Sequence, residues 1–145
     1  MDVLLRNNAL ELARLLHDHN GGDVVVMDMM PLDFWTDYFV IATVTSNTHM
    51  SGLERHIKNF LLEKDLKIIY RTRRPGSKPG RSYRDNESPA LGPEEWCLLD
   101  LGGIVIHLMT ANSRSFYELE RLWSAAPLIF QGNLITTDAY SSKSS

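Results

Sequence analysis

No serine or cysteine of this sequence lies in a known catalytic pattern. Nucleophilic catalysis needs a serine or cysteine beside a base, usually on an exposed turn. The single cysteine, Cys97, follows Trp96 inside an apolar run, where a thiol is more often inert core packing than a nucleophile. The sequence has no G-x-S-x-G turn, and Gly76-Ser77-Lys78 lacks the rest of a phosphate-binding loop. These residues therefore predict no nucleophile and no phosphate site.

The five histidines do not form a metal-binding pattern. His17 and His19 stand on either side of the end of a predicted helix, so they cannot share one face. His49 and His56 are seven residues apart on another predicted helix, which is too far to bind one ion jointly. His107 lies inside a predicted strand. We interpret each histidine as a structural residue and expect no metal and no other cofactor.

Acidic residues in the first third of the chain are also poorly arranged for catalysis. Two-metal phosphoryl transfer favours a pair of carboxylates at alternating positions of one strand. The aspartates here are four or five residues apart and fall on strand, loop and turn: Asp23, Asp28, Asp33 and Asp37. The sequence therefore predicts a protein that is not an enzyme.

One predicted strand combines aromatic, apolar and acidic residues on a single face. Trp96, Leu98 and Asp100 occupy alternate positions, and alternate side chains of a strand point to the same side. In one interpretation Trp96 and Leu98 are core residues and Asp100 belongs to the turn beside Gly102. In the other, the three residues form a tryptophan-centred binding face with a charge at its rim, as in interface hot spots. Spacing alone favours the first interpretation.

The elements that would position these side chains are three helices and five strands. Helical spacing of apolar residues predicts helices over 8–19, 46–63 and 112–123. Short apolar or β-branched runs predict strands over 24–27, 38–42, 67–70, 96–101 and 104–109. A Gly102-Gly103 hairpin requires antiparallel pairing, whereas the crossover through the second helix is long enough for parallel pairing. The predicted fold is α/β, a single layered domain with a mixed five-stranded sheet.

The spacing within two helices also predicts which side chains are buried. In the 46–63 helix, these are Met50, Leu53, Ile57, Phe60 and Leu61. Glu54 is expected on the outer face of this helix, paired with Lys58. In the last helix the predicted inward residues are Phe116, Leu119 and Trp123.

The length and composition of the chain indicate one soluble domain. The chain has 145 residues, of which 43% are hydrophobic and 23% charged, and no apolar run approaches the roughly 18 residues of a membrane span. The first residues show no cleavable signal, so a cytoplasmic location is expected. We predict a domain over residues 1–123, with a long basic loop at 71–93, and a flexible C-terminal tail at 124–145.

The basic loop is the most unusual feature of the charge pattern. Residues 71–84 contain six positive charges and no acid, which leaves −9 on the rest of a chain whose net charge is −3. Four prolines and three glycines between residues 71 and 93 predict a surface loop without regular structure. Such a run is usually a solvated surface loop, but it also makes a plain RNA-binding module a candidate function.

Three sequence blocks resemble one known family. The first is D-Y-F-V-I at 37–41, followed by Thr45, Ser46 and His49. The second is W-C-L-L-D-L-G at 96–102 with V-I-H at 105–107, and the third is R-x-x-Y-E-L-E-x-L-W at 114–123. In this order and spacing they resemble the ribosomal silencing factor family, also called the Iojap family, over roughly residues 8–123. The chain departs from the usual family pattern at Val44, Thr48 and Gly103.

The resemblance implies a fold related to nucleotidyltransferases that lacks their catalytic carboxylates. It also implies a translational repressor that binds the large ribosomal subunit through ribosomal protein L-fourteen and sterically blocks joining of the small subunit. Organelle relatives aid large-subunit assembly, and family members can self-associate as homodimers. A nucleotidyltransferase-like enzyme acting on nucleotides or RNA remains an alternative, suggested only by the related fold.

Two sets of residues are expected to make these contacts. Ribosomal-protein binding is predicted for Trp96, Leu98, Asp100, Gly102, Asp37 and Tyr38. Contact of the basic loop with ribosomal RNA backbone is predicted for Arg73, Arg74, Lys78, Arg81 and Arg84.

Overall fold

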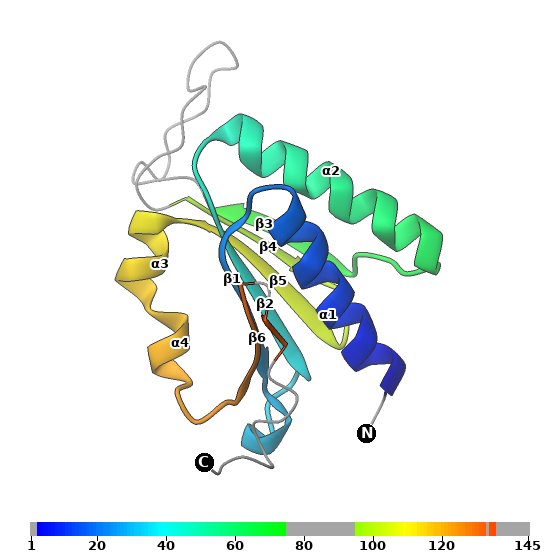
Figure 1. Ribbon diagram of the computed structural model, residues 1–145, viewed down its shortest axis with the longest axis vertical. Helices are drawn as coiled ribbons and strands as arrows, with labels where there is room; N and C mark the ends of the chain where they lie inside the picture. Colours follow the sequence, from blue (N-terminus) through cyan, green and yellow to red (C-terminus); the bar gives the residue numbers. More distant parts are fainter. Residues whose placement is uncertain (1–2, 75–94, 133, 136–145) are drawn as a thin grey trace.

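The computed structural model describes residues 3–74, 95–132 and 134–135 (Figure 1). The described helices are α1 (Val3–Asp18), the short 3-10 helix η1 (Met30–Leu32), α2 (Asn47–Lys64), α3 (Ala111–Tyr117) and α4 (Leu119–Leu122). The described strands are β1 (Gly22–Asp28), β2 (Tyr38–Val44), β3 (Tyr70–Arg74), β4 (Trp96–Asp100), β5 (Ile104–Thr110), β6 (Leu128–Gln131) and β7 (Leu134–Ile135).

All the described strands form one sheet in the order β3-β4-β5-β2-β1-β6-β7. Strands β2 and β5 pair in parallel, and the other pairs are antiparallel. Helices α1 and α2 lie on one face of the sheet, and α3 and α4 lie on the other (Figure 1). This arrangement confirms an α/β fold with a mixed sheet, but the predicted five strands are two fewer than the seven found.

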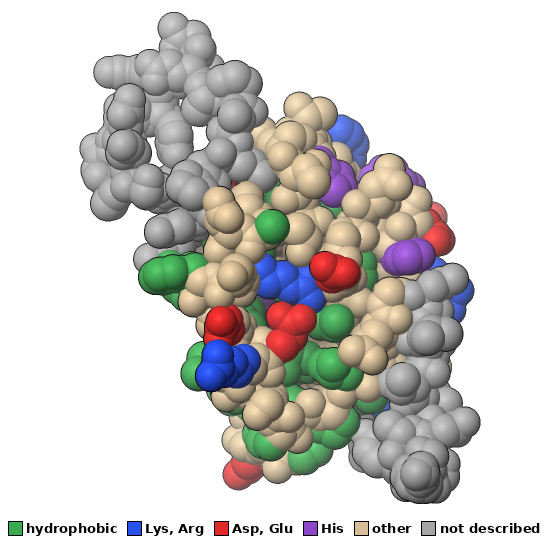
Figure 2. Space-filling view, turned by 60° about the vertical axis from the view of Figure 1, so that its left-hand side comes forward, with side chains coloured by type: hydrophobic (Ala, Val, Ile, Leu, Met, Phe, Trp, Pro, Cys, Tyr) green, Lys and Arg blue, Asp and Glu red, His purple; other side chains and the backbone are tan. Residues whose placement is uncertain are grey.

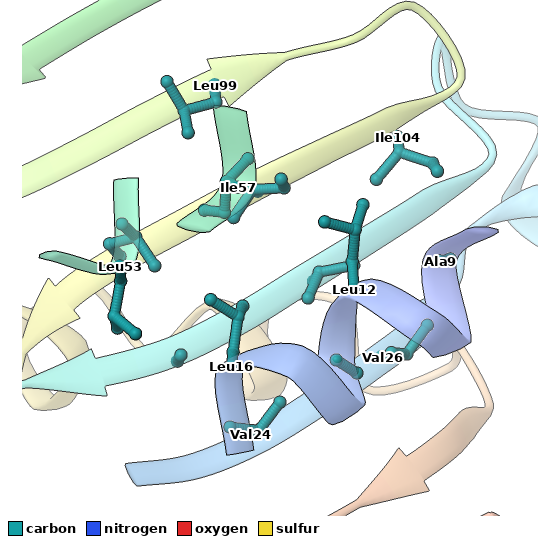
Figure 3. Close-up of a cluster of buried hydrophobic side chains, with 14 of the residues drawn as sticks. Ala9, Leu12, Leu16, Val24, Val26, Leu53, Ile57, Leu99 and Ile104 are labelled. Carbon is teal, nitrogen blue, oxygen red and sulfur yellow. The ribbon is translucent and has the colours of Figure 1, made fainter. Parts of the chain in front are cut away.

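The face under α1 and α2 holds the larger hydrophobic core. Leu12 and Leu16 of α1 and Leu53 and Ile57 of α2 point towards the strands and are almost completely buried (Figure 3). Burying one such side chain contributes roughly 1.5–3 kcal/mol. The five residues predicted to be buried in the second helix are all buried.

Local capping sets the ends of α2 close to those predicted. The Ser46 hydroxyl accepts a hydrogen bond from the His49 backbone N–H at 3.0 Å, which satisfies one of the free donors at the helix start. At the other end Asp65 has a left-handed backbone with φ of 58°, and its N–H donates to the carbonyls of Leu61 and Leu62.

The predicted last helix, residues 112–123, is two short helices. Glu118 interrupts it with a φ of 50°, and its backbone N–H donates to the Arg114 carbonyl. The chain therefore changes direction after about two helical turns. Leu119 is buried as predicted, but the inward orientation predicted for Phe116 is wrong, since that side chain is 68% exposed.

The predicted boundary after residue 123 falls inside the folded domain. Strand β6 pairs with β1, and its residues Ile129 and Phe130 are fully buried. The segment from residue 124 onwards is therefore not simply a tail, because β6 and β7 extend the sheet. Residues 136–145 lie outside the described part of the chain.

Candidate functional site

Strand β4 divides its side chains between the two faces of the sheet. Cys97 and Leu99 are fully buried under α1 and α2. Trp96 and Leu98 are partly buried and pack against the second core on the opposite face, and Asp100 is also only partly buried. The common face predicted for Trp96, Leu98 and Asp100 is confirmed. Trp96 and Leu98 border a core, as the first interpretation expects, and they remain partly accessible, while the binding face stays a prediction.

The neighbouring strand β3 widens this surface. Tyr70 lies directly opposite Asp100, and Thr72 lies opposite Leu98. Directly opposed residues of antiparallel strands project to the same side. Tyr70 is 57% exposed. We call the surface formed by Tyr70, Thr72, Trp96, Leu98 and Asp100 the Trp96 face.

A buried histidine and a tyrosine fix the position of Trp96. The indole Nε1–H donates to His107 Nδ1 at 3.1 Å, and the Trp96 and Tyr117 rings lie 4.8 Å apart. His107 is 3% exposed and meets the Phe39 ring edge-on at 4.5 Å. Burial lowers the pKa of His107 to about 3, because a charged imidazole would lose its hydration. The acceptor facing Trp96 is therefore a neutral imidazole.

Asp100 serves the turn as well as the surface. Its Oδ1 accepts a hydrogen bond from the Gly102 N–H at 2.9 Å. Gly102 has a φ of 105°, which L-residues with a side chain rarely adopt. These contacts fix the turn at the end of β4, so the carboxylate has a defined position at the rim of the Trp96 face.

The two predicted site residues from β2 and the segment before it are placed differently. The Asp37 backbone N–H donates to the Gly103 carbonyl at 3.1 Å, so Asp37 lies beside the β4–β5 turn and is partly exposed. Tyr38 is fully buried in the core under α1, and burial is the main cause of its raised pKa. The structure therefore brings together five of the predicted residues and places the Tyr38 side chain on the opposite face.

The first arginines of the predicted basic loop belong to a strand. The strand predicted at 67–70 instead runs from Tyr70 to Arg74, because these residues pair with β4. Arg71 forms an ion pair with Glu54, and Arg73 Nε donates to Glu95 Oε2 at 2.7 Å.

The carboxylates that pair with these arginines are buried or nearly buried on the side of the sheet that α1 and α2 cover. Glu54 is 6% exposed, so its predicted outward position beside Lys58 is wrong. Arg73 also donates to Asn47, which leaves its guanidinium committed within the fold. The remaining predicted RNA contacts are not tested: only the backbone of Arg74 is described, and Lys78, Arg81 and Arg84 lie outside the described residues.

Catalytic and metal-binding groups do not converge within the described residues. Burial raises the pKa of the Cys97 thiol to about 12, so it is protonated and unreactive. His19 and His56 stack at 3.7 Å, yet no group of three His, Cys, Asp or Glu there is arranged to hold a metal ion. No helix in the described part of the chain is long and apolar enough to cross a membrane.

A partly buried arginine on the α3–α4 side, Arg114, begins the third sequence block, but the sequence alone predicts no role for its side chain. Arg114 donates to Thr43 Oγ1 at 2.9 Å and to the Gly22 carbonyl at 3.3 Å, and it forms a bidentate ion pair with the Glu120 carboxylate. With Asp23 it lines a hollow of about 460 Å³. Figure 2 shows basic and acidic side chains together among hydrophobic ones on this face. Because its donors bind groups of β1, β2 and α4, Arg114 holds the broken helix against the sheet.

Comparison with known proteins agrees with this architecture. The sequence model described as "Ribosomal silencing factor during starvation" matches residues 5–145. The chain belongs to the ribosomal silencing factor family. The resemblance found in the three sequence blocks is thereby confirmed, and the match extends beyond residue 123 to include β6.

Individual relatives in the ribosomal silencing factor family cover most of this chain. The ribosomal silencing factor of Treponema pallidum is 33% identical over 115 residues, covering 79% of this chain and 88% of the relative. The mouse mitochondrial assembly of ribosomal large subunit protein 1 is 30% identical over 113 residues, which is 78% of this chain but only 43% of the mouse protein. A crystal structure of a Chromobacterium violaceum protein has the same fold, with a TM-score of 0.62 at 23% identity over 86% of this chain and 88% of the other.

Proposed function

We propose that this protein represses translation by binding the large ribosomal subunit through ribosomal protein L-fourteen and blocking joining of the small subunit. Family membership supports the ribosomal role. The observation that carries the choice of surface is the Trp96 face, where an ordered tryptophan remains accessible at the edge of a core. We propose a second role in large-subunit assembly, because the mouse relative is named for that process.

The Trp96 face has the properties of a protein-binding surface. Trp96 and Leu98 provide apolar area, and interface hot spots are rich in tryptophan held in well-packed surroundings. Asp100 and Asp37 lie at the β4–β5 turn end of this face and favour a basic partner. Tyr38 is left out of the proposed interface, because its side chain is fully buried under α1.

The proposed role is non-catalytic, and no observation favours the nucleotidyltransferase-like alternative. Asp28, which is 4% exposed, uses Oδ1 to accept the Met30 backbone N–H at 3.0 Å, so this acid supports a turn. Contact with ribosomal RNA is proposed for Arg74, Lys78, Arg81 and Arg84, and Arg73 is left out because Glu95 and Asn47 engage its guanidinium. A cytoplasmic location and a homodimer stay predictions.

Sedimentation and a joining assay test this proposal. The protein should co-migrate in a sucrose gradient with isolated large subunits, and added small subunits should fail to form whole ribosomes in its presence. Trp96→Ala should weaken both effects. Leu62→Ala is the matched control, because Leu62 is 78% exposed on α2, on the other side of the sheet. Equal binding by wild type and Trp96→Ala would place the interface elsewhere.

A further inference from the structure

The hydrogen bond between Trp96 and His107 uses the only donor of the indole ring. Nε1–H points to His107 Nδ1 at 3.1 Å. His107 lies on β5 directly opposite Leu98, and at 3% exposure it is beneath the Trp96 face rather than part of it. A partner that meets Trp96 therefore does not meet a free N–H group.

The same hydrogen bond determines where the histidine carries its proton. A neutral imidazole has one N–H and one acceptor nitrogen, so a ring that accepts at Nδ1 is protonated at Nε2. His107 Nε2 is buried and has no hydrogen-bond partner among the described residues. Leucine or phenylalanine would fill this position without a buried unpaired donor. What the imidazole supplies, and those residues cannot, is the acceptor for Trp96.

Packing completes the support of the tryptophan. Tyr117, from the end of α3, lies 4.8 Å from the Trp96 ring, and Phe39 lies 4.5 Å from the His107 ring. Phe39 in turn contacts Trp123 at 5.3 Å. The acceptor is thus held by β2, β5 and the segment after α4, and cannot turn away without disturbing the second core.

We infer that His107 is a positioning residue that presents Trp96 in one orientation with its indole N–H satisfied internally, so that a protein partner contacts Trp96 by apolar packing. The inference rests on the proposed function, since it takes Trp96 as an interface anchor. It specifies the partner surface: apolar side chains, and no hydrogen-bond acceptor directed at the indole nitrogen.

Nuclear magnetic resonance of the free protein tests the positioning itself. Long-range ¹H–¹⁵N spectra should show His107 as the Nε2–H form, and the Trp96 indole N–H should exchange slowly with solvent. His107→Phe should make that exchange fast. His107→Asn should restore slow exchange, because the asparagine Oδ1 can take the place of Nδ1. Fast exchange of the Trp96 indole in wild type would overturn the inference.

Binding to isolated large subunits tests whether the hydrogen bond between Trp96 and His107 contributes to partner binding. His107→Phe should weaken binding about tenfold, the effect of about one lost hydrogen bond, and His107→Asn should stay within about threefold of wild type. In a Trp96→Ala background, His107→Phe should have no further effect, because coupled residues give non-additive losses. Wild-type affinity of His107→Phe, together with weak binding by Trp96→Ala, would overturn the inference and leave the proposed function intact.

Two further outcomes keep the test decisive. Wild-type binding by Trp96→Ala would overturn the proposed interface and the inference with it. If His107→Phe does not fold, the wild-type complex with purified ribosomal protein L-fourteen answers instead. In that complex the Trp96 indole N–H should keep its scalar coupling across the hydrogen bond to His107. If the N–H instead donates to an acceptor of the partner, the inference is overturned.

Discussion

The two faces of the sheet are covered to different extents, although they are built from the same strands. On one face, α1 and α2, with 16 and 18 residues, cover a continuous apolar core. On the other, α3 and α4 have only 7 and 4 residues, and the Trp96 face remains partly exposed. Adjacent residues of β4 show the difference, since Leu99 is fully buried and Leu98 is not. The less covered face is therefore the one that we propose for contact with a partner.

The two faces also use their polar groups differently. Near α2, the carboxylates of Glu54 and Glu95 form ion pairs with Arg71 and Arg73 at the edge of the sheet. We call the face under α1 and α2 the closed face, and the face that carries Trp96 the open face. On the open face, the neutral His107 supports Trp96, and the Arg114–Glu120 ion pair lies away from the Trp96 face, where it holds the broken helix against the sheet. Substitutions on the closed face should reduce stability, whereas substitutions on the open face should reduce binding.

The largest effect is expected on the closed face. Leu99→Ala should lower the free energy of unfolding by about 2–5 kcal/mol, because it leaves a cavity in a fully buried site. Urea denaturation measures this loss. The fraction that remains folded should bind large subunits as wild type does. A loss below 1 kcal/mol, on the scale of a surface substitution, would contradict the contrast between the faces.

Trp96→Ala tests the open face. Truncation of an aromatic anchor costs about 2 kcal/mol, so binding to the large subunit should weaken roughly thirtyfold. The protein should still fold, because Trp96 lies at the border of the core. Sedimentation gives the affinity and circular dichroism gives the melting temperature. An unfolded variant would instead assign Trp96 to the core.

The buried histidine should make stability depend on pH. The folded-state pKa of about 3 lies below the ordinary value of 6.5, so between these values the unfolded chain binds a proton that the folded chain does not. The contribution of His107 is complete above pH 6.5 and is lost as the pH falls towards 3, with a slope of up to about 1.4 kcal/mol per pH unit. Urea denaturation between about pH 6 and pH 4 measures the slope, because both values lie inside the window in which only the unfolded chain binds the proton. His107→Asn should have a smaller slope, and equal slopes would contradict this source of acid sensitivity.

The effect of the Asp100 charge on binding can be measured separately from the hydrogen bond by which Asp100 supports the β4–β5 turn. Asp100→Lys should restore subunit joining, because it places a positive charge against a basic partner. Asp100→Asn is the control, since its side-chain oxygen can still accept the Gly102 N–H. We expect the asparagine variant to weaken binding less than the lysine variant and to melt as wild type does. A full block of joining by Asp100→Lys would remove this residue from the interface.

The smallest effect concerns the basic segment. Each lost phosphate contact should reduce the slope of log affinity against log salt by about 0.7–0.9. Serine at Lys78, Arg81 and Arg84 together should therefore flatten the slope by about two units. Arg73→Ser should leave the slope unchanged, because Arg73 is paired within the fold. An unchanged slope in the triple variant would make the segment a solvated loop without a nucleic-acid partner.

Elements with strong local signals could be predicted from the sequence. Helix α2 has a capping serine and apolar residues at helical spacing, and it runs from Asn47 to Lys64, against a prediction of 46–63. The sequence does not predict strand β6, because four residues after a proline carry little local pattern and pair with β1, which lies about a hundred residues earlier in the chain. The sequence predicts a loop at Arg71 and Arg73 for the same reason, since only pairing with β4 makes them a strand.

The candidate site likewise combines features that the local sequence predicts with features that depend on tertiary packing. The sequence by itself determined that Trp96, Leu98 and Asp100 share a face, because side-chain alternation is a local property of extended backbone. Only the tertiary structure decided that this face is the less covered one, since that depends on which helices cross which strands. It also placed Tyr38 on the opposite side, and it brought His107 beneath Trp96 from eleven residues away. The register of β4 with β5 is fixed by the hairpin turn between them, whereas the burial of His107 depends on Phe39 of β2, which packs against it from another part of the chain.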